Sequence, residues 1–300
     1  MIFCRGCKWR LYCLKIILLV LIFQTSIMAE DPLLELADSL MLARFYSDAI
    51  TEYYRYSFFN SHSSCLDGIY SKVGFCFANQ MKWDDAIEAI DKSIFYAQND
   101  SLMEQRNVDR SVMYLALGNI SKAQFYLKEI ASSSAYNNVR DRASILLFLS
   151  LILNHDWQAA YDTYELEIKN RHIESVLLES TLINAINIDY KSPTIASFLS
   201  TLIPGMGQFY NGRWLAGLNA MALNGTFGYL TINSLIKERY TSGFLVFIFL
   251  FQRYYNGNRY QAYYHAIEHN EMVNSYYEKT ILDYIQSVYD INQTSALRKR

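Results

Sequence analysis

Apolar positions recur at a fixed interval through the first half of the chain. An alanine stands at four positions separated by 37 residues each, namely Ala49, Ala86, Ala123 and Ala160. Apolar residues occur three positions before and four positions after each alanine, a spacing that places them all on one face of a helix. These flanking residues are Tyr46 and Tyr53, Trp83 and Ile90, Ile120 and Leu127, and Trp157 and Tyr164. A constant period of this length predicts an array of structural repeats.

A second apolar stripe precedes each alanine and predicts a partner helix in every unit. The residues nine positions before the alanines are Leu40, Phe77, Tyr114 and Leu151. Each unit is therefore expected to be a helical hairpin. Ser47, Asp84 and Ser121 are predicted to cap the amino ends of second helices, because their side-chain oxygens can accept bonds from free backbone amides. Gly118 is predicted to end the first helix of its unit.

Two segments carry this pattern most clearly, GFCFANQMKWDDAIEAIDKSI from Gly74 and YLALGNISKAQFYLKEI from Tyr114. Over residues 33–170 the chain resembles the tetratricopeptide repeat, although its unit is longer than the usual length of about 34 residues. The resemblance implies an all-α solenoid of stacked hairpins that binds other proteins. We predict that the repeats and a capping helix at Ile173–Ile188 together occupy residues 30–190.

The resemblance also implies that the first helices of the units line an inner groove available to a partner. The matching positions in the four units are Asp38 and Met41, Phe75 and Ala78, Val112 and Leu115, and Leu149 and Ile152. Such a groove is mostly apolar, so it could receive an amphipathic helix or a hydrophobic peptide of another protein. Alternatively, the chain's own polypeptide could fill it.

The first 29 residues have the pattern of an export signal. Four basic residues precede an apolar run over residues 16–23, and Ala29 offers a small residue for cleavage. Residues 1–29 are therefore predicted to be a signal peptide or, if uncut, an N-terminal anchor. In both cases the repeats lie outside the cytoplasm. Cys4 and Cys7 belong to this segment, and we assign them no function.

The second half of the chain carries few charges and predicts a membrane domain over residues 191–257. Residues 214–236 contain no charged side chain and are long enough to cross a hydrocarbon layer of about 30 Å. A shorter span is predicted at residues 240–255, and the interrupted apolar stretch at 194–212 is expected to be re-entrant or interfacial. The positive charges of Lys237 and Arg239 favour a cytoplasmic position for the linker between the spans. Residues 258–300 are predicted to form an amphipathic helix and a basic tail.

A glycine-rich motif precedes the first predicted span. It reads P-G-x-G-Q-x-Y-x-G and is followed by an Asn-Gly pair and by Tyr-x-Gly-Asn. Its residues are Pro204, Gly205, Gly207, Gln208, Tyr210 and Gly212, then Asn224 and Gly225, then Tyr255, Gly257 and Asn258. Over residues 192–270 the chain resembles a bacterial membrane domain of the TM2-like kind. The resemblance implies a place in the bacterial cytoplasmic (inner) membrane, with lipid as a partner. The export signal predicts that the repeats lie on the periplasmic or extracytoplasmic side.

Charge excludes one class of function. The formal net charge is −2 at pH 7. Binding to nucleic acid needs a basic surface that replaces phosphate counterions, so no nucleic-acid partner is expected. The chain has 25 tyrosines, and we assign them to packing rather than to base stacking because most of them follow helical stripes.

His265, Glu268 and His269 are the sharpest candidate for catalysis, because H-x-x-E-H is the order of one class of zinc peptidase. Both histidines would share one helical face. A catalytic zinc site needs a further protein ligand, and the acidic residues that follow belong to what looks like the same helix. An integral-membrane metallohydrolase is therefore kept as an alternative function.

Three asparagines, Asn219, Asn224 and Asn233, lie within the first predicted span. Amides in lipid must find hydrogen-bond partners, so these residues are interpreted as contacts between helices. A small-solute pathway lined by them is a further alternative.

These patterns together favour binding over catalysis. The preferred function is a membrane-anchored tetratricopeptide-repeat scaffold that mediates protein–protein interaction at the bacterial cell envelope, with assembly of envelope proteins as one role. We expect no enzyme activity, no catalytic residue, no metal and no cofactor.

Overall fold

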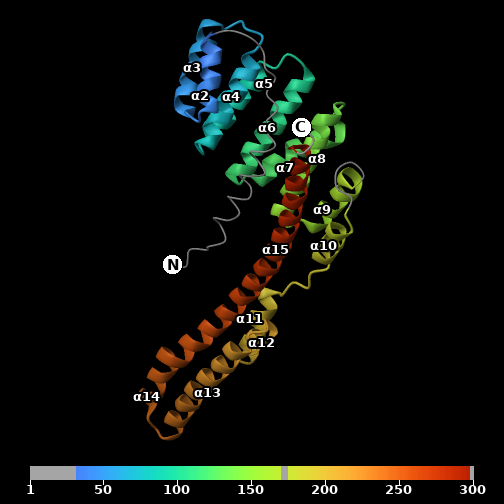
Figure 1. Ribbon diagram of the computed structural model, residues 1–300. Coiled ribbons are helices and arrows are strands. Elements are labelled where there is room, and N and C mark those ends of the chain that lie inside the picture. The colour runs from blue at the N-terminus through green and yellow to red at the C-terminus, as the bar shows by residue number, and fades with distance from the viewer. Residues whose placement is uncertain (1–31, 170–174, 298–300) are drawn as a thin grey trace. The chain divides into compact units, whose positions relative to one another are not determined.

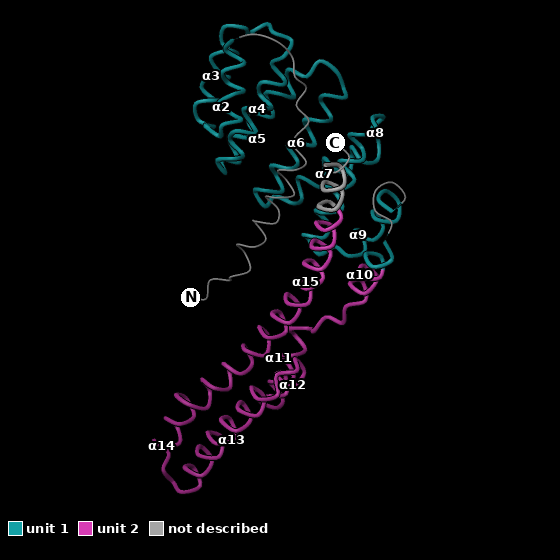
Figure 2. Tube along the Cα trace, viewed as in Figure 1, with its two compact units in different colours: residues 1–179, 292–300 teal, residues 180–291 magenta. Residues whose placement is uncertain are grey.

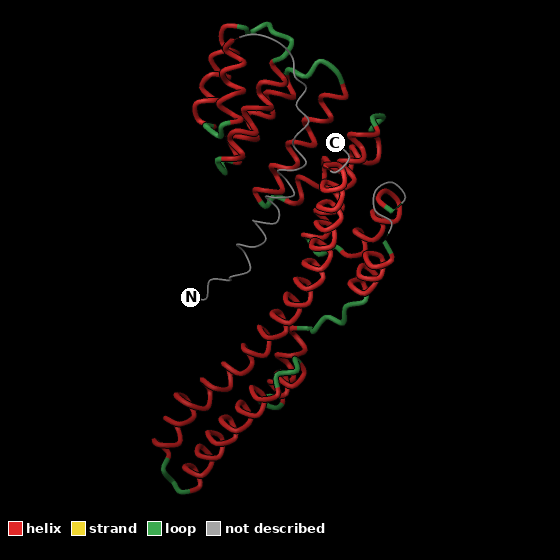
Figure 3. The backbone as a smooth tube through the Cα atoms, in the orientation of Figure 1, coloured by secondary structure: helices red, strands yellow, loops and turns green. Residues whose placement is uncertain are grey.

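The computed structural model describes residues 32–169 and 175–297, with side chains up to residue 288. Every regular element within these ranges is a helix (Figure 1, Figure 3), which confirms the predicted all-α class. The chain divides into two compact units, which we call unit 1 (Met1–Glu179 and Asn292–Arg300) and unit 2 (Ser180–Ile291) (Figure 2). The predicted export signal at 1–29, the start of the predicted capping helix at Ile173 and the basic end of the tail lie outside the described residues.

Unit 1 is built from helices that are joined in pairs by short turns. The pairs are α2 (Pro32–Leu42) with α3 (Tyr46–Phe59), α4 (Leu66–Asn79) with α5 (Trp83–Phe95), α6 (Asp100–Leu117) with α7 (Ile120–Ser133), and α8 (Asn137–Leu153) with α9 (Trp157–Thr163). A π-helical turn, η1 (Tyr164–Ile168), continues α9. From α2 to α9, each helix contacts the next one in the chain, and α6 also contacts α8. The hairpins therefore pack in sequence order, each against its neighbour.

The periodic alanines occupy equivalent positions in this arrangement. Ala49, Ala86, Ala123 and Ala160 lie in α3, α5, α7 and α9, and each has an exposed fraction of 0%. A side chain that ends at Cβ lets two helices approach closely. Gly74 on α4 serves the same purpose, because a Cβ at this position would lie 2.8 Å from the Cδ1 atom of Ile90 on α5. The alanine face predicted from the sequence is thus buried between helices.

The predicted N-caps are wrong, whereas the predicted helix end at Gly118 is confirmed. Ser47, Asp84 and Ser121 are each the second residue of their helices, so they lie inside the first turn. The cap of α7 is Asn119, whose side-chain oxygen accepts a hydrogen bond from the backbone of the first turn. Gly118 follows α6 in the left-handed conformation, with φ of 86°, which glycine adopts without strain.

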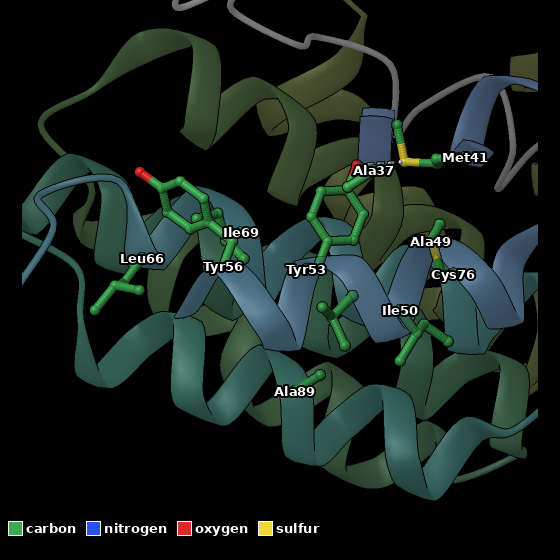
Figure 4. Packing of buried hydrophobic residues seen from close by; sticks show 11 residues of the cluster. Ala37, Met41, Ala49, Ile50, Tyr53, Tyr56, Leu66, Ile69, Cys76 and Ala89 are labelled. Carbon is green, nitrogen blue, oxygen red and sulfur yellow. Dashed lines mark hydrogen bonds between the residues drawn. The ribbon is translucent and has the colours of Figure 1, made fainter. Parts of the chain in front are cut away.

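Figure 4 shows the core of the first two hairpins, where a tyrosine is fully enclosed. The Tyr53 hydroxyl donates to Oδ1 of Asp38 at 2.5 Å and lies 3.6 Å from the sulfur of Met41. Burial, together with the nearby Asp38 carboxylate, raises the pKa of Tyr53. Burial also raises the pKa of the Cys76 thiol to about 12. Cys65, which directly precedes α4, and Cys76 within α4 are free thiols.

Unit 2 contains a long helical hairpin. Its elements are α11 (Pro193–Leu202), α12 (Met206–Tyr210), α13 (Trp214–Ile236), α14 (Tyr240–Leu245), the π-helical segment η2 (Val246–Phe251) and α15 (Gln252–Leu297). The last three form one continuous helical segment that runs back beside α13 (Figure 1). In the described part of the chain, no helix has both the length and the apolar character needed to cross a membrane.

The boundaries of unit 2 differ from the expected ones. The division between the two units falls inside α10 (Val176–Ile186), before the predicted boundary at residue 191. α15 passes through residue 258 without a break, although a separate amphipathic helix was expected to begin there. The predicted interruption at 194–212 is present, because Ile203–Gly205 separates α11 from α12.

Candidate functional site

The glycine-rich motif brings α11, α12 and α15 into close contact. Gly205 has φ of 98°, and a Cβ there would overlap the carbonyl oxygen of Gly217 on α13. A Cβ on Gly207 would overlap the carbonyl oxygen of Ala196 on α11 and would lie 2.7 Å from Cβ of Ala262 on α15. Only glycine fits these two positions, since a contact with the backbone cannot be relieved by a side-chain rotation.

Buried side chains then tie the three helices together, and we call Ser200, Gln208, Asn211 and Asn258 the carboxamide core. Gln208 is fully buried and bridges two helices. Its Nε2 donates to the carbonyl oxygen of Asn258 at 3.0 Å, and its Oε1 accepts from Oγ of Ser200 at 3.1 Å. The same serine oxygen accepts from the Gly207 backbone amide at 3.0 Å.

The two asparagines of the carboxamide core act in the same way. Nδ2 of Asn211 donates to the carbonyl oxygen of Ala262 at 2.8 Å, and Nδ2 of Asn258 donates to that of Ser200 at 3.4 Å. The Oδ1 atoms of both asparagines are buried without a hydrogen-bond partner in the described residues. The nearby Tyr255 hydroxyl adds a bond to the carbonyl oxygen of Thr201 at 2.7 Å. The motif residues therefore position helices.

A second set of bonds fixes the segment before α11. The Ser192 backbone amide donates to the Tyr210 hydroxyl at 3.0 Å, and Nζ of Lys191 lies 5.2 Å from the centre of the Tyr210 ring. Asn270 on α15 accepts from the backbone amide of Lys191 at 2.8 Å and donates to its carbonyl oxygen at 2.9 Å. These contacts explain the tyrosine of the motif as an anchor for the chain leading into α11.

The remaining motif residues do not join the carboxamide core. No atom lies within 4 Å of a Cβ built on Gly212, Gly225 or Gly257, although Gly212 has φ of 76° and therefore favours glycine. Asn224 is buried on α13, but its Nδ2 donates only to the carbonyl oxygen of Ala220 in the same helix. Of the motif glycines, Gly205 and Gly207 are thus required by close neighbours, whereas Gly225 and Gly257 are not.

Unit 2 exposes large apolar side chains on its surface and buries the polar side chains of the carboxamide core. Side chains that are more than half exposed include Phe198, Leu202, Leu215, Ile236, Phe244 and Phe249. Small apolar side chains, namely Ala196, Ala262 and Ala266, are also buried in this unit. In a protein surrounded by water, large exposed apolar patches usually mark an interaction site.

The three asparagines of α13 do not line one path. Asn224 is buried, whereas Asn219 is exposed and Asn233 is half-buried. At 3.6 residues per turn, Asn224 points about 140° away from Asn219, while Asn233 lies within about 40° of Asn219. A solute pathway lined by all three is therefore not supported by the geometry.

In the H-x-x-E-H sequence, the glutamate forms an ion pair with an arginine and does not join a set of metal ligands. Oε2 of Glu268 on α15 forms an ion pair with Nη2 of Arg213 at 2.8 Å. His265 is partly buried beside them. In the described residues, no three His, Cys, Asp or Glu side chains gather closely enough to hold a metal ion. The geometry thus adds no support for the metallohydrolase alternative with His265, Glu268 and His269.

The environment of His265 makes a pH dependence of unit 2 testable. Burial lowers the pKa of His265, the Arg213 guanidinium lowers it further, and Glu268 opposes the shift. The unfolded chain, with a histidine pKa of about 6.5, binds the proton more readily than the folded chain. The contribution of neutral His265 to the stability of unit 2 should therefore be fully present above about pH 6.5. It should be lost as the pH falls below that value.

We expect hydrogen exchange of α15 to accelerate between about pH 7.5 and about pH 5.5, after correction for the intrinsic exchange rate. The variant His265→Gln should show a flatter dependence, because it removes the titrating group. Equal slopes in the two proteins would contradict this assignment.

The predicted groove residues of unit 1 are mostly buried. Met41, Val112, Leu115, Leu149 and Ile152 all have exposed fractions below 9%. They pack in the core and offer no open surface, which corrects their interpretation as partner contacts. The reason is that apolar residues on first helices are covered by neighbouring helices.

Three of the eight groove residues keep partial exposure. Asp38 pairs with Nζ of Lys72 at 2.7 Å, and Phe75 packs edge-on against Tyr46 with ring centres 6.4 Å apart. Ala78 lies near the end of α4 and is also partly exposed. Partner binding stays a prediction for these three positions.

A series of ion pairs links the first helices of successive hairpins, and we call it the ion-pair ladder. The pairs are Asp38 with Lys72, Asp67 with Arg106, and Asp109 with Arg142, at N–O distances of 2.7, 3.3 and 2.7 Å. They join α2 to α4, α4 to α6, and α6 to α8. Arg106 also lies 3.3 Å from Asp109 within α6. Sequence reasoning missed the ladder, but opposite charges about one repeat apart are a signal that could have found it.

Comparisons of the chain with protein-family models, with curated proteins and with solved structures find no match. The resemblances to the tetratricopeptide repeat and to a TM2-like membrane domain therefore stay predictions. The function must be argued from the geometry of the two units.

Proposed function

We propose that this protein is a membrane-anchored scaffold, in which unit 2 is embedded in a bilayer and unit 1 is a repeat solenoid that binds another protein. The observation that carries the proposal is the reversed polarity of unit 2. Its large apolar side chains face outward, and the carboxamides of Gln208, Asn211 and Asn258 face inward. An apolar solvent favours this distribution, because the buried amides donate to backbone carbonyl oxygens inside the unit while the apolar side chains contact lipid.

The placement of charge supports the same environment. Between Pro193 and Gln252, charged residues occur only at Arg213 and at the linker Lys237–Arg239. Both sites lie at ends of α13, as expected for the edges of a membrane-embedded helix. Trp214 and Tyr240 are exposed at the same two ends, where amphipathic rings favour the interface with water.

The architecture of unit 1 supports a binding function. Hairpins that contact only their neighbours form arrays with extended surfaces, and such arrays commonly bind proteins. The ion-pair ladder holds successive first helices in register, which would keep that surface rigid. On this proposal the protein acts in the bacterial cell envelope, with unit 1 on the extracytoplasmic side of the inner membrane and a peptide or helix of another protein as its partner. Assembly of envelope proteins is one role that such a scaffold serves.

Extraction of membranes tests the bilayer part of the proposal. The full chain is expected to stay with the lipid pellet in alkaline carbonate and to enter solution only with detergent. The double variant Leu218→Lys, Phe244→Lys should be released, because it places two charges on exposed apolar positions of unit 2.

The matched control is Phe58→Lys, Phe95→Lys, which changes apolar positions of unit 1 that are even more exposed and should remain in the pellet. Recovery of the unaltered chain in the aqueous fraction would refute the proposed anchoring. A photo-crosslinking residue at Ala78 should then give protein adducts in these membranes that the same residue at the exposed Glu88 of α5 does not.

A further inference from the structure

One side of α13 carries a seven-residue repeat that no other helix of unit 2 covers. Asn219, Thr226 and Asn233 are spaced by seven residues, and Ala222 and Tyr229 lie three residues after the first two. We call these five residues the α13 seam. Asn219, Ala222, Thr226 and Tyr229 are exposed, and Asn233 is half-buried. A period of seven with alternating steps of three and four is the pattern of two paired helices.

The α13 seam lies opposite the side by which α13 packs into unit 2. Gly217 and Asn224 are the buried residues of α13. At 100° per residue, the α13 seam is centred about 170° around the helix from these two positions. The same helix can therefore pack against unit 2 and against a second helix at once.

We propose that the α13 seam pairs with the α13 seam of a second copy of this chain, in parallel. This inference rests on the proposed place of unit 2 in the bilayer. Within the described residues, the side chains of Asn219 and Asn233 make no hydrogen bond, and an unpaired amide in lipid is costly. Two copies inserted in the same direction bring identical residues to the same depth.

The chemistry of the seam favours an identical partner over an unrelated one. A carboxamide both donates and accepts, so Asn219 can pair with Asn219 of another copy, and Asn233 with its own equivalent. Asparagine at this kind of position selects parallel, in-register pairs of helices. Ala222 and Thr226 are small enough to let the two backbones approach between the asparagines.

Disulfide crosslinking in membranes tests the pairing. In the full chain with its five native cysteines replaced by alanine, Ala222→Cys is placed on the seam. Met221→Cys is the matched control, because it is exposed at the same depth but points about 100° around the helix. Under mild oxidation, Ala222→Cys should form dimers several-fold faster than Met221→Cys.

A second measurement uses energy transfer between labelled copies in lipid vesicles. The variant Asn219→Leu, Asn233→Leu should weaken association by roughly tenfold, because two interhelical amide pairs are lost. The variant with glutamine at both positions keeps the carboxamides and should retain most of the association. Equal crosslinking at the two cysteines, or unchanged association of the leucine variant, would overturn the pairing. A chain that stays in the carbonate pellet but is monomeric contradicts the pairing alone, whereas a chain released by carbonate contradicts the proposed anchoring.

Discussion

Replacing Gly207 with alanine is expected to destabilise unit 2 by about 3 to 4 kcal/mol. The added Cβ meets the backbone carbonyl of Ala196 and lies 2.7 Å from Cβ of Ala262, so α11 or α15 must move. Such a shift also lengthens the bond from the Gly207 amide to Oγ of Ser200. Because Ser200 is the acceptor for one bond and the donor to Gln208 in another, the carboxamide core should loosen as a unit.

Hydrogen exchange measured by mass spectrometry checks this expectation locally. Peptides covering α12 and the first half of α15 should exchange about a hundredfold faster in Gly207→Ala, which corresponds to a loss of roughly 3 kcal/mol. The matched control is Gly257→Ala, since no atom lies within 4 Å of a Cβ at that position, which lies inside α15. This control should slow exchange slightly, because alanine favours a helix over glycine by about 0.5 to 1 kcal/mol. Similar behaviour of the two variants would show that the close contact at Gly207 does not limit the packing.

The variant Asp109→Ala is expected to destabilise unit 1 by about 3 kcal/mol. Asp109 contacts Arg106 and Arg142, and its side chain is only 9% exposed. Removing the carboxylate leaves the Arg142 guanidinium without its counterion in a poorly solvated place, and it leaves Arg106 with Asp67 alone. Nη2 of Arg142 approaches the carboxylate at 2.7 Å without the alignment of a hydrogen bond, so its contribution is chiefly the attraction of charges.

Urea unfolding followed by the fluorescence of the buried Trp157 measures this effect. The midpoint should fall by about 1 to 2 M in Asp109→Ala. Glu88→Ala removes a carboxylate from the exposed pair of Glu88 with Lys92 and should leave the midpoint almost unchanged. If both variants unfold at the same urea concentration as the parent chain, the ion-pair ladder does not stabilise unit 1.

The sequence allowed the helical hairpins and the helix end at Gly118 to be located, but not the starts of the second helices. The alanine period marks the second helices because a small residue is needed wherever two helices cross closely, and this requirement leaves a trace in the composition of each unit. Ser47, Asp84 and Ser121 were mistaken for caps because capping depends on local backbone geometry within one or two residues. The cap at Asn119 could be recognised only when the start of α7 was known.

The candidate site shows a similar division. Gly207 and Gly257 belong to the same motif, but only the first has neighbours that exclude a Cβ. The sequence motif alone could not show which of the two glycines is required, because the neighbours of Gly207 include residues 196 and 262, which lie outside the motif. The groove residues were misjudged for the same reason. Val112 and Leu149 have the spacing of an inner surface, and their burial depends on helices from other parts of the chain.

The sequence by itself determined the all-α class, the repeat of hairpins in the first half and the scarcity of charge in the second. These properties depend on periodicity and composition, which are present in any stretch of the chain before it folds. The tertiary structure decided which glycines are required, how Asp67, Arg106, Asp109 and Arg142 pair, and that polar amides lie inside unit 2 while apolar side chains lie outside. Burial and ion pairing are properties of neighbours in space, and helices far apart in the chain supply those neighbours.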